Sequence, residues 1–498
     1  MAEHEIAIFS PIPPEQNGIA DYTYHLVAAM RHVVPCAVYA NQPDGSLPDG
    51  VPIREPLQAF RHLRPETAIL HQVGNNPGHI FVLDALRKWG GVTTLHDQNL
   101  HYLYEVSHAP KSLLSRIMRD SSDRLGAVFA RQWFENGTKT GANYALFDML
   151  GEVLSRSTAV IVHSRFAKNR IRLLYGAEAA ENVHVVPHLA LPPDNRTDDF
   201  LHGVLKIPDG VPLIMTSGFA TFAKRFDWLV AALDEIASRG AGFFWVHAGK
   251  ERPEEYDLSG LLERYPEVKR RSCITGYLSE EQLNECIAAC DVLINLRYPS
   301  VGESSGTLAR AMAAGRCCVV NSTASYADLP PGSVLHVPVM GAVPALVEGL
   351  ECLLRAPELR AAYGGRALAL ARGEWAPEAV ARAYAGIMAE FGVRLEGATA
   401  PRPTGTPLLS FPIDAAALRQ EIEQHVRGCT GNVEIRLSAS SPEQLARISM
   451  QTPLLFADVL PQDLQIHAVT VEQDNTKPRG RDAEDAPGVA LVLKGVLG

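Results

Sequence analysis

The stretch at residues 292–321 constrains the fold of this chain more than any other. An apolar run at Val292–Leu296 predicts a buried strand, which a loop with one proline and two glycines follows. Thr307–Ala314 is a run of good helix formers that stops at Gly315, and Cys317–Val320 predicts the next strand. Strand, loop, helix and strand in this order form a βαβ unit, which joins parallel strands in an α/β sheet.

The start of this helix carries groups that suit a phosphate. Glu303, Ser304 and Ser305 precede it, and Gly306 and Thr307 open its first turn. Backbone N–H groups at a helix N-terminus carry partial positive charge, so an anion is stabilised there. We therefore consider two interpretations, a phosphate site and a purely structural turn, and the rest of the chain must decide between them.

Composition narrows the class of protein. A length of 498 residues is typical of about three domains at roughly 150 residues each. The net charge of −10 disfavours nucleic acid as a main partner, because phosphate backbones select for clustered Lys and Arg. The eight cysteines show neither a disulfide framework nor zinc-ligand spacing, which predicts reduced thiols and no metal site. The acidic N-terminus lacks signal-peptide features, and no apolar run approaches the ~20 residues of a membrane span, so we expect a soluble cytoplasmic protein.

Short apolar runs alternate with helical patterns along most of the chain, which predicts two doubly wound parallel sheets. The expected strands of the first half are Glu5–Phe9, Cys36–Ala40, Ala68–Gln72, Val92–His96, Ser157–His163 and Val183–Pro187. Those of the second half, besides the two already named, are Leu213–Thr216, Phe243–Ala248 and Cys273–Thr275. The longest expected helix covers most of Lys111–Leu154, and Ser279 with Gln282 has the form of a capping box.

We expect four parts in the chain. Residues 1–195 form an N-terminal Rossmann-like domain, and residues 205–375 form a second domain of the same kind, with a cleft between them. A helix at 376–392 follows. Beyond a linker rich in proline and glycine at 398–407, residues 408–498 form a small α/β appendage whose role the sequence does not indicate.

In the first half, polar side chains gather where expected strands end. Ligands of open α/β sheets bind at the carboxyl ends of the strands, so these positions predict a site. Gly18 lies at the first strand-to-helix turn, where backbone can approach a phosphate; a need for positive φ is the alternative reason for this glycine. The other candidates are Asn75, Asn76, His96, Asp97 and His101. For His96, a structural role at the strand end is the alternative.

The second half has its own candidate turn. Gly218 follows the first expected strand, and Lys224 and Arg225 stand at the start of the next helix, where they could neutralise phosphate oxygens. A solvated pair of cations is the alternative reading.

In order and spacing, these segments resemble the family 4 glycosyltransferases, retaining nucleotide-sugar enzymes of the GT-B fold, in particular the bacterial members. The resemblance covers roughly Glu5–Phe391, and its main segments are NGIADYTYHL, GVTTLHDQNLH, GFATFAKRFDWLVAAL and GESSGTLARAMAAGRCCVV. WAPEAVARAYAGIMAEF resembles the final helix of that family, which crosses back onto the first domain.

The resemblance implies a role for each matching residue. The catalytic residues would be His96, beside the donor sugar, and Glu303, on the hydroxyls of the transferred sugar. The donor-binding residues would be Gly18, Gly218, Lys224, Arg225, Ser304, Ser305, Gly306, Thr307 and Arg310. The acceptor-binding residues would be Asn75, Asn76, Asp97 and His101.

The chain departs from the family pattern at Arg310. The family has a second Glu eight positions after the first, where it holds the ribose of the nucleotide. Here the interval from Glu303 to Arg310 is one residue shorter, and an arginine replaces the carboxylate. The ribose contact is therefore the part of the pattern that this sequence does not reproduce, and a guanidinium there would meet a phosphate instead. The family's Arg before the lysine is also missing, since Phe219 takes its place.

The resemblance implies a retaining glycosyltransferase that moves a hexose from a nucleotide-diphosphate sugar to a carbohydrate or lipid-linked acceptor in bacterial surface-glycan synthesis. No Asp-X-Asp occurs in the sequence, which fits a metal-independent reaction without a cofactor. One alternative is a non-catalytic relative that binds nucleotide sugars and docks a partner; another is a nucleotide-sugar epimerase or phosphorylase. Lys111, Arg116 and Arg119 among apolar residues form a short basic amphipathic segment, which fits peripheral association with the inner face of the cell membrane. A core-facing helix with a solvated charged side is the alternative and the more common case. No sequence feature indicates an oligomeric state.

Overall fold

The computed structural model describes most of the chain up to residue 393. The described residues are 5–15, 17–42, 44–107, 147–193, 203, 205–208 and 210–393, with the backbone of strands 431–439, 464–474 and 488–497. The basic segment at 111–119, most of the expected helix at Lys111–Leu154 and the linker at 398–407 lie outside them. Both large sheets belong to one compact unit, and the three C-terminal strands belong to another.

The first sheet has seven parallel strands in the order β3-β2-β1-β4-β5-β6-β7. Its strands are β1 Ile6–Phe9, β2 Cys36–Tyr39, β3 Ile53–Arg54, β4 Ile69–Val73, β5 Gly91–Leu95, β6 Ser157–Val162 and β7 Val183–Val185. The six strands expected from sequence are confirmed. β3 was not predicted, since two residues are too short to show a pattern. The order reverses direction between β1 and β4, as in a doubly wound sheet.

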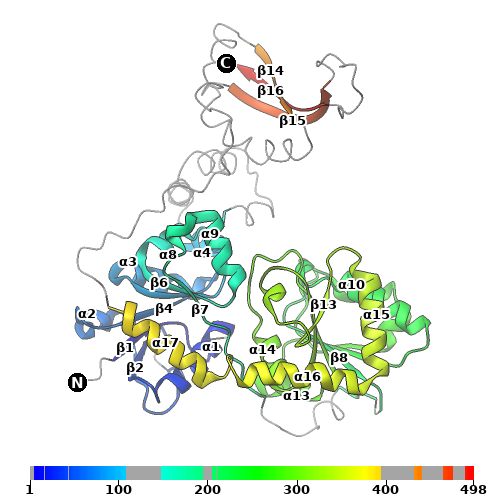
Figure 1. Cartoon of the computed structure of the whole chain (residues 1–498), viewed down its shortest axis with the longest axis horizontal. Helices are drawn as coiled ribbons and strands as arrows, with labels where there is room; N and C mark the ends of the chain where they lie inside the picture. The colour runs from blue at the N-terminus through cyan, green and yellow to red at the C-terminus, as the bar shows by residue number, and fades with distance from the viewer. Residues whose placement is uncertain are drawn as a thin grey trace. The chain divides into compact units, whose positions relative to one another are not determined.

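Helices connect these strands and cover the first sheet (Figure 1). They are α1 Gly18–Met30, α2 Ala59–His62, α3 Ile80–Trp89, α4 His101–Ser107, α8 Gly151–Arg156 and α9 Arg165–Ala179. α1 buries Tyr22, Leu26 and Met30 at helical spacing against the sheet, as the sequence predicted.

The second sheet has six parallel strands in the order β10-β9-β8-β11-β12-β13, which repeats the order of the first sheet. Its strands are β8 Leu213–Ser217, β9 Phe244–Ala248, β10 Ser272–Ile274, β11 Val292–Asn295, β12 Cys317–Asn321 and β13 Leu335–Val337. Its helices are α10 Phe226–Ser238, α11 Leu258–Glu263, α12 Pro266–Arg270, α13 Glu280–Ala289, α14 Gly306–Ala313, α15 Ala342–Arg355 and α16 Pro357–Arg372. Two Rossmann-like sheets of this order confirm the expected fold class.

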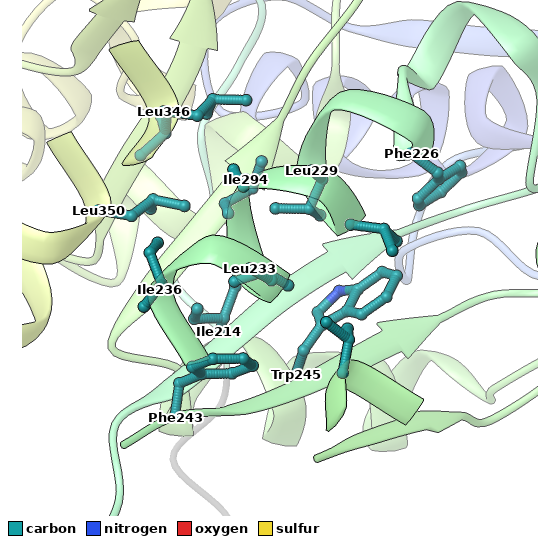
Figure 2. Packing of buried hydrophobic residues seen from close by; sticks show 14 of the residues in the cluster. Ile214, Phe226, Leu229, Leu233, Ile236, Phe243, Trp245, Ile294, Leu346 and Leu350 are labelled. Carbon is teal, nitrogen blue, oxygen red and sulfur yellow. The ribbon is translucent and has the colours of Figure 1, made fainter. Parts of the chain in front are cut away.

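Two hydrophobic cores hold the second sheet, one on each face. Figure 2 shows the first, to which Leu229 and Leu233 of α10, Leu346 and Leu350 of α15 and the buried Trp245 of β9 all belong. The second core packs α13, α14 and α16 on the opposite face. Ser279 caps α13 in a capping box with Gln282, as the sequence predicted.

The helix that follows the second sheet's domain, α17 Pro377–Phe391, packs on the first sheet's domain, against α1, β5 and β6 (Figure 1). The Tyr384 hydroxyl lies 3.0 Å from the Tyr22 hydroxyl of α1 and 3.1 Å from the Thr94 hydroxyl of β5. Beyond the helix, the Gly392 carbonyl accepts a hydrogen bond from Ile69 N at 3.0 Å. The chain thus crosses twice between the two sheets.

In the C-terminal unit, three strands form an antiparallel sheet in the order β14-β16-β15. They are β14 Gly431–Ala439, β15 Leu464–Asp474 and β16 Gly488–Leu497. The helices expected at 415–426 and 442–450 lie outside the described residues. Among the helices that are described, none is both long enough and apolar enough to span a membrane.

The core of the second sheet generates a stability prediction. Leu350 is fully buried, so Leu350→Ala should lower the free energy of unfolding by about 2–5 kcal/mol through lost burial and the cavity left behind. Guanidinium unfolding measures the change. The control Met340→Ala, at a side chain 87% exposed in the same domain, should change it by less than about 0.5 kcal/mol. Equal effects of the two substitutions would contradict this packing.

Candidate active site

A cavity of about 610 Å³ lies where strands of both sheets end. The first sheet's domain contributes the start of α1 and the segments after β5, β6 and β7. The second sheet's domain contributes the segment after β10 and the first turns of α13 and α14. The candidates from sequence that line this cavity are Gly18, Asn76, His96, Asp97, Ser304, Gly306, Thr307 and Arg310. Residues predicted from two separate halves of the chain are therefore brought to one space.

The start of α14 presents a helix N-terminus to this cavity. The Ser305 side chain caps the helix by accepting a hydrogen bond from Leu308 N at 3.3 Å, and its hydroxyl lies 3.2 Å from Asn295 Oδ1 of β11. The cap satisfies one of the N–H groups that have no partner inside a helix, and the others of the first turn remain suited to an anion. Gly306 and Thr307, in that turn, lie on the cavity wall.

The start of α1 presents a second helix N-terminus. Asn17 is its cap and accepts a hydrogen bond from Ile19 N at 3.0 Å. Gly18 is not in the left-handed φ region, so a need for positive φ does not explain this glycine. A Cβ built on Gly18 would have no heavy atom within 4 Å. The missing side chain therefore leaves open space on the cavity wall, as a close approach of ligand to backbone requires.

Both ring nitrogens of His96 are engaged by the protein. His96 Nε2 lies 2.7 Å from Gln72 Oε1, and His96 Nδ1 lies 3.1 Å from His163 Nε2. Burial, with the neighbouring histidines, lowers the pKa of His96 well below its usual value. A hydrogen bond from His96 to a substrate hydroxyl would therefore have to replace one of these two contacts.

Of the four expected acceptor residues, Asn76 and Asp97 line the cavity, whereas Asn75 and His101 do not. Asn75 N donates to Asp97 at 2.7 Å, while the Asn75 side chain accepts from Leu103 N at 2.8 Å, so Asn75 ties the two loops together. Asn76 caps a short turn by accepting from Gly78 N at 2.9 Å. His101 is fully buried and does not belong to the lining residues of the cavity.

Burial raises the pKa of Asp97 to about 6, and the negative charge of Glu303 adds to that shift. The hydrogen bond from Asn75 N acts in the opposite direction. Asp97 therefore changes its charge near neutral pH, at the wall of the cavity.

The predicted phosphate cations Lys224 and Arg225 do not line this cavity. Lys224 Nζ donates to the Ser217 carbonyl, and burial, followed by the charge of Arg297, lowers the pKa of Lys224 well below its usual value. Gly218 is left-handed at φ 78°, a backbone conformation that favours glycine.

Arg225 is held at the surface of the second sheet's domain. Its Nη2 lies 2.5 Å from Asp227 Oδ2, and its guanidinium packs over the rings of Phe222 and Trp228, at 4.8 Å and 4.1 Å from their centroids. A phosphate would have to compete with Asp227 for this cation.

Glu303 lies in the loop before α14 and off the lining of the cavity. It accepts hydrogen bonds from the Ser300 hydroxyl at 2.8 Å and from Val301 N at 3.2 Å, and Arg297 Nε lies 3.7 Å away. Arg297, which directly follows the apolar run of β11, was not predicted. It is the cation between Lys224 and Glu303, because its charge acts on the first and pairs with the second.

Arg310 is on the cavity wall but is already paired. Its guanidinium lies 2.9 Å from Glu280 Oε1 and 3.1 Å from Asn284 Oδ1, both on α13. His25 Nε2 of α1 is 3.7 Å from the same Glu280 oxygen. These contacts, first that of His25 and then those of Arg310, lower the pKa of Glu280 to about 2. Where the family pattern has a carboxylate, this chain has Arg310, which forms an ion pair with Glu280 of the neighbouring helix α13.

Sequence reasoning missed several residues of the cavity wall. His163 and His188 follow β6 and β7, so the rule of polar residues at strand ends could have found them. Tyr277 and Glu280 also line the cavity, but neither directly follows an expected strand, so the same rule could not have found them. Glu280 stands within the predicted capping sequence of Ser279 and Gln282. Within the described ranges, no group of three His, Cys, Asp or Glu side chains could hold a metal ion.

Comparison with known proteins agrees with this geometry. Residues 211–355 match the family model described as Glycosyl transferases group 1. This part of the chain is therefore similar to the group 1 glycosyltransferases. Among curated proteins, none matches the sequence.

Solved structures identify the fold of the larger part of the chain. Sucrose-phosphate synthase from Thermosynechococcus elongatus aligns with a TM-score of 0.50 and 14% identity over 78% of this chain and 98% of its own. WaaG, a glycosyltransferase involved in lipopolysaccharide biosynthesis, aligns with a TM-score of 0.51 and 15% identity over 76% of this chain and 100% of its own. Anabaena HepE in complex with UDP-glucose aligns with a TM-score of 0.50 and 13% identity over 78% of this chain and 99% of its own. The chain has the GT-B fold, as the sequence predicted.

The raised pKa of Asp97 generates a prediction on stability. An acid whose folded pKa of about 6 exceeds its usual value of 3.8 stabilises the fold below pH 4, and this contribution is lost as the pH rises through 6. Asp97→Asn removes that loss and keeps an acceptor for Asn75 N. The melting temperature of the variant relative to wild type should therefore be higher at pH 7 than at pH 4.5.

The control is Asp84→Asn, which removes an exposed carboxylate of α3 paired with Arg87. Its melting temperature relative to wild type should show no rise of this kind between the two pH values. A difference for Asp97→Asn that is the same at both pH values would contradict the assignment.

Proposed function

We propose that the protein is a retaining glycosyltransferase that transfers a hexose from a nucleotide-diphosphate sugar to a carbohydrate or lipid-linked acceptor. The observation that carries the proposal is the cavity onto which the N-termini of α1 and α14 both open. The similarity to the group 1 glycosyltransferases and the GT-B fold support it.

A leaving diphosphate needs its developing charge stabilised, and two helix starts suit that task. N–H groups of the first turn of α14, with Ser304 and Thr307 beside them, would meet the phosphates. Gly18 leaves space for the ligand against the start of α1. We propose that these groups act without a metal ion, and that Lys224 and Arg297, which lie off the lining of the cavity, add to the stabilisation of the diphosphate.

The acceptor must also lose a proton during transfer. In the front-face reaction that we propose, the leaving phosphate accepts this proton while the new bond forms on the same face of the sugar. Glu303 then positions sugar hydroxyls and does not form a covalent bond. Its contacts to Ser300 and Val301 hold the carboxylate in one orientation, as such a role requires.

Two further features belong to the proposal. The acceptor side would be the Asn76 and Asp97 wall of the cavity, on the first sheet's domain. The setting would be bacterial surface-glycan synthesis in the cytoplasm, at the inner face of the membrane. The HepE structure contains UDP-glucose, so UDP-glucose is the first donor to try.

Gly18→Val tests the site directly. The valine side chain would occupy the open space in the cavity, whereas the backbone φ of Gly18 tolerates a side chain. We expect wild type to consume one member of a panel of nucleotide sugars, and the variant to bind it at least about tenfold more weakly, a loss of about 1.4 kcal/mol. Mass spectrometry of donor consumption and calorimetry of binding give the two readings.

The matched control is Gly365→Val on α16, where a Cβ also meets no heavy atom within 4 Å, but away from the cavity wall. Its donor consumption and affinity should equal those of wild type. Unchanged binding in Gly18→Val would contradict the site. Binding of nucleotide sugars without turnover would favour a non-catalytic binding module instead, and isomer formation without an acceptor would favour an epimerase.

A further inference from the structure

A chain of partly buried hydrogen bonds runs from Gln72 to Val186 along the wall of the cavity. Gln72 Oε1 lies 2.7 Å from His96 Nε2, and His96 Nδ1 lies 3.1 Å from His163 Nε2. His163 Nδ1 lies 3.0 Å from the Val186 carbonyl. The two imidazoles come from the ends of β5 and β6, and both line the cavity.

The number of protons on this chain depends on the Gln72 amide. The Val186 carbonyl can only accept, so His163 carries a proton on Nδ1. If both rings are neutral, His163 Nε2 accepts from His96 Nδ1, and His96 Nε2 must then accept from the Gln72 amide nitrogen. In the structure the Gln72 oxygen faces His96 Nε2 instead, which requires a proton on that nitrogen as well. Three N–H groups on two imidazoles amount to one positive charge.

The orphaned end of Gln72 agrees with this count. Gln72 is fully buried, and its amide nitrogen is without a hydrogen-bond partner among the described residues. The oxygen-facing and nitrogen-facing arrangements therefore differ by one proton and a half-turn of the amide. Among the described residues, the amide nitrogen of Gln72 makes no hydrogen bond that would fix either arrangement.

The surroundings decide when the extra proton is held. The groups that face the pair are Tyr22 of α1, His79 after β4, His188 after β7 and, through His188, Arg310 of α14. Asp97, which follows His96 in the chain, lines the same cavity. Burial lowers the pKa of His163 to about 4 and that of His96 well below its usual value, which disfavours the extra proton at pH 7 when the cavity holds no anion. An anion in the cavity favours the charged form and raises its pKa toward neutral pH.

We propose that His163 is a positioning residue for His96, and that the two rings form one unit that takes up a single proton when a nucleoside diphosphate enters the cavity. The inference rests on the proposed function, since it takes the ligand to be that of a nucleotide-sugar enzyme. The proton comes from solvent and is shared between His96 and His163, and the Gln72 oxygen, which faces His96 Nε2 in the structure, accepts the hydrogen bond from that nitrogen. The unit thereby adds a positive charge beside the diphosphate only while the diphosphate is bound.

Proton uptake on ligand binding tests this unit. UDP-glucose is the probe, because both of its phosphates are bridged and do not titrate near neutral pH. Calorimetric titrations at pH 6.5 in two buffers of different ionisation enthalpy give the number of protons taken up. We expect uptake approaching one proton for wild type. His163→Gln, whose amide can replace the hydrogen bond at Nε2 but cannot be protonated, should take up clearly fewer protons than wild type, and the remaining uptake is that of Asp97, whose pKa of about 6 an anion also raises.

His184→Asn is the control, because His184 lies on β7 and is not among the residues that line the cavity. It should retain the uptake of wild type. Binding without uptake in wild type, or unchanged uptake in His163→Gln, would overturn the proposal while leaving the glycosyltransferase assignment intact.

A second measurement on the free protein needs no ligand. Histidine ¹⁵N spectra should show His163 protonated on Nδ1, and should show His96 and His163 responding together in one transition as the pH falls. Two independent transitions, or a His163 proton on Nε2 in the neutral ring, would overturn the proposal. Absence of UDP-glucose binding with coupled titration would count against the proposed donor and not against the histidine unit.

Discussion

The site depends on one constraint of parallel sheets: the carboxyl ends of all their strands lie at the same edge. Each sheet here reverses direction at its centre, beside β1 and β8, and there the chain turns from strand into helix or loop. In the first sheet the turn after β1 starts α1 at Gly18, and in the second the turn after β11 starts α14 at Gly306. Both helix starts meet one cavity, so two sets of backbone N–H groups surround one space.

Carboxylates outnumber arginines among the residues that line this cavity. Arg310 and Glu280 neutralise each other, with His25 as a third member that joins α1 to α13. The cations Lys224 and Arg297 lie beyond the wall, near Glu303. Partial charges of helix termini therefore supply much of the positive potential available to a phosphate. In our proposal, His96 and His163 add a positive charge only while the diphosphate is bound.

Sequence patterns predicted the strands and helices well because their signals are local. The capping box at Ser279 and the helix formers of α14 each read out a single element, and both are confirmed. The site was predicted in part: Gly18 and Thr307 line one cavity, because strand ends converge whatever the details of packing. The pairing of Arg310 with Glu280 could not be predicted, since it joins two helices that the sequence relates only through the sheet. The chain of bonds around His96 was hidden for the same reason.

The central claim is that the two helix starts hold the diphosphate of a nucleotide sugar. Hydrogen-exchange mass spectrometry with and without UDP-glucose tests it most directly, because bound phosphate slows exchange of the N–H groups that it contacts. The account predicts slower exchange in peptides that contain Gly18 to Asp21 and Ser304 to Arg310, with little change in the exposed turn around Met340. Slower exchange elsewhere in the chain, with both helix starts unaffected, would contradict it.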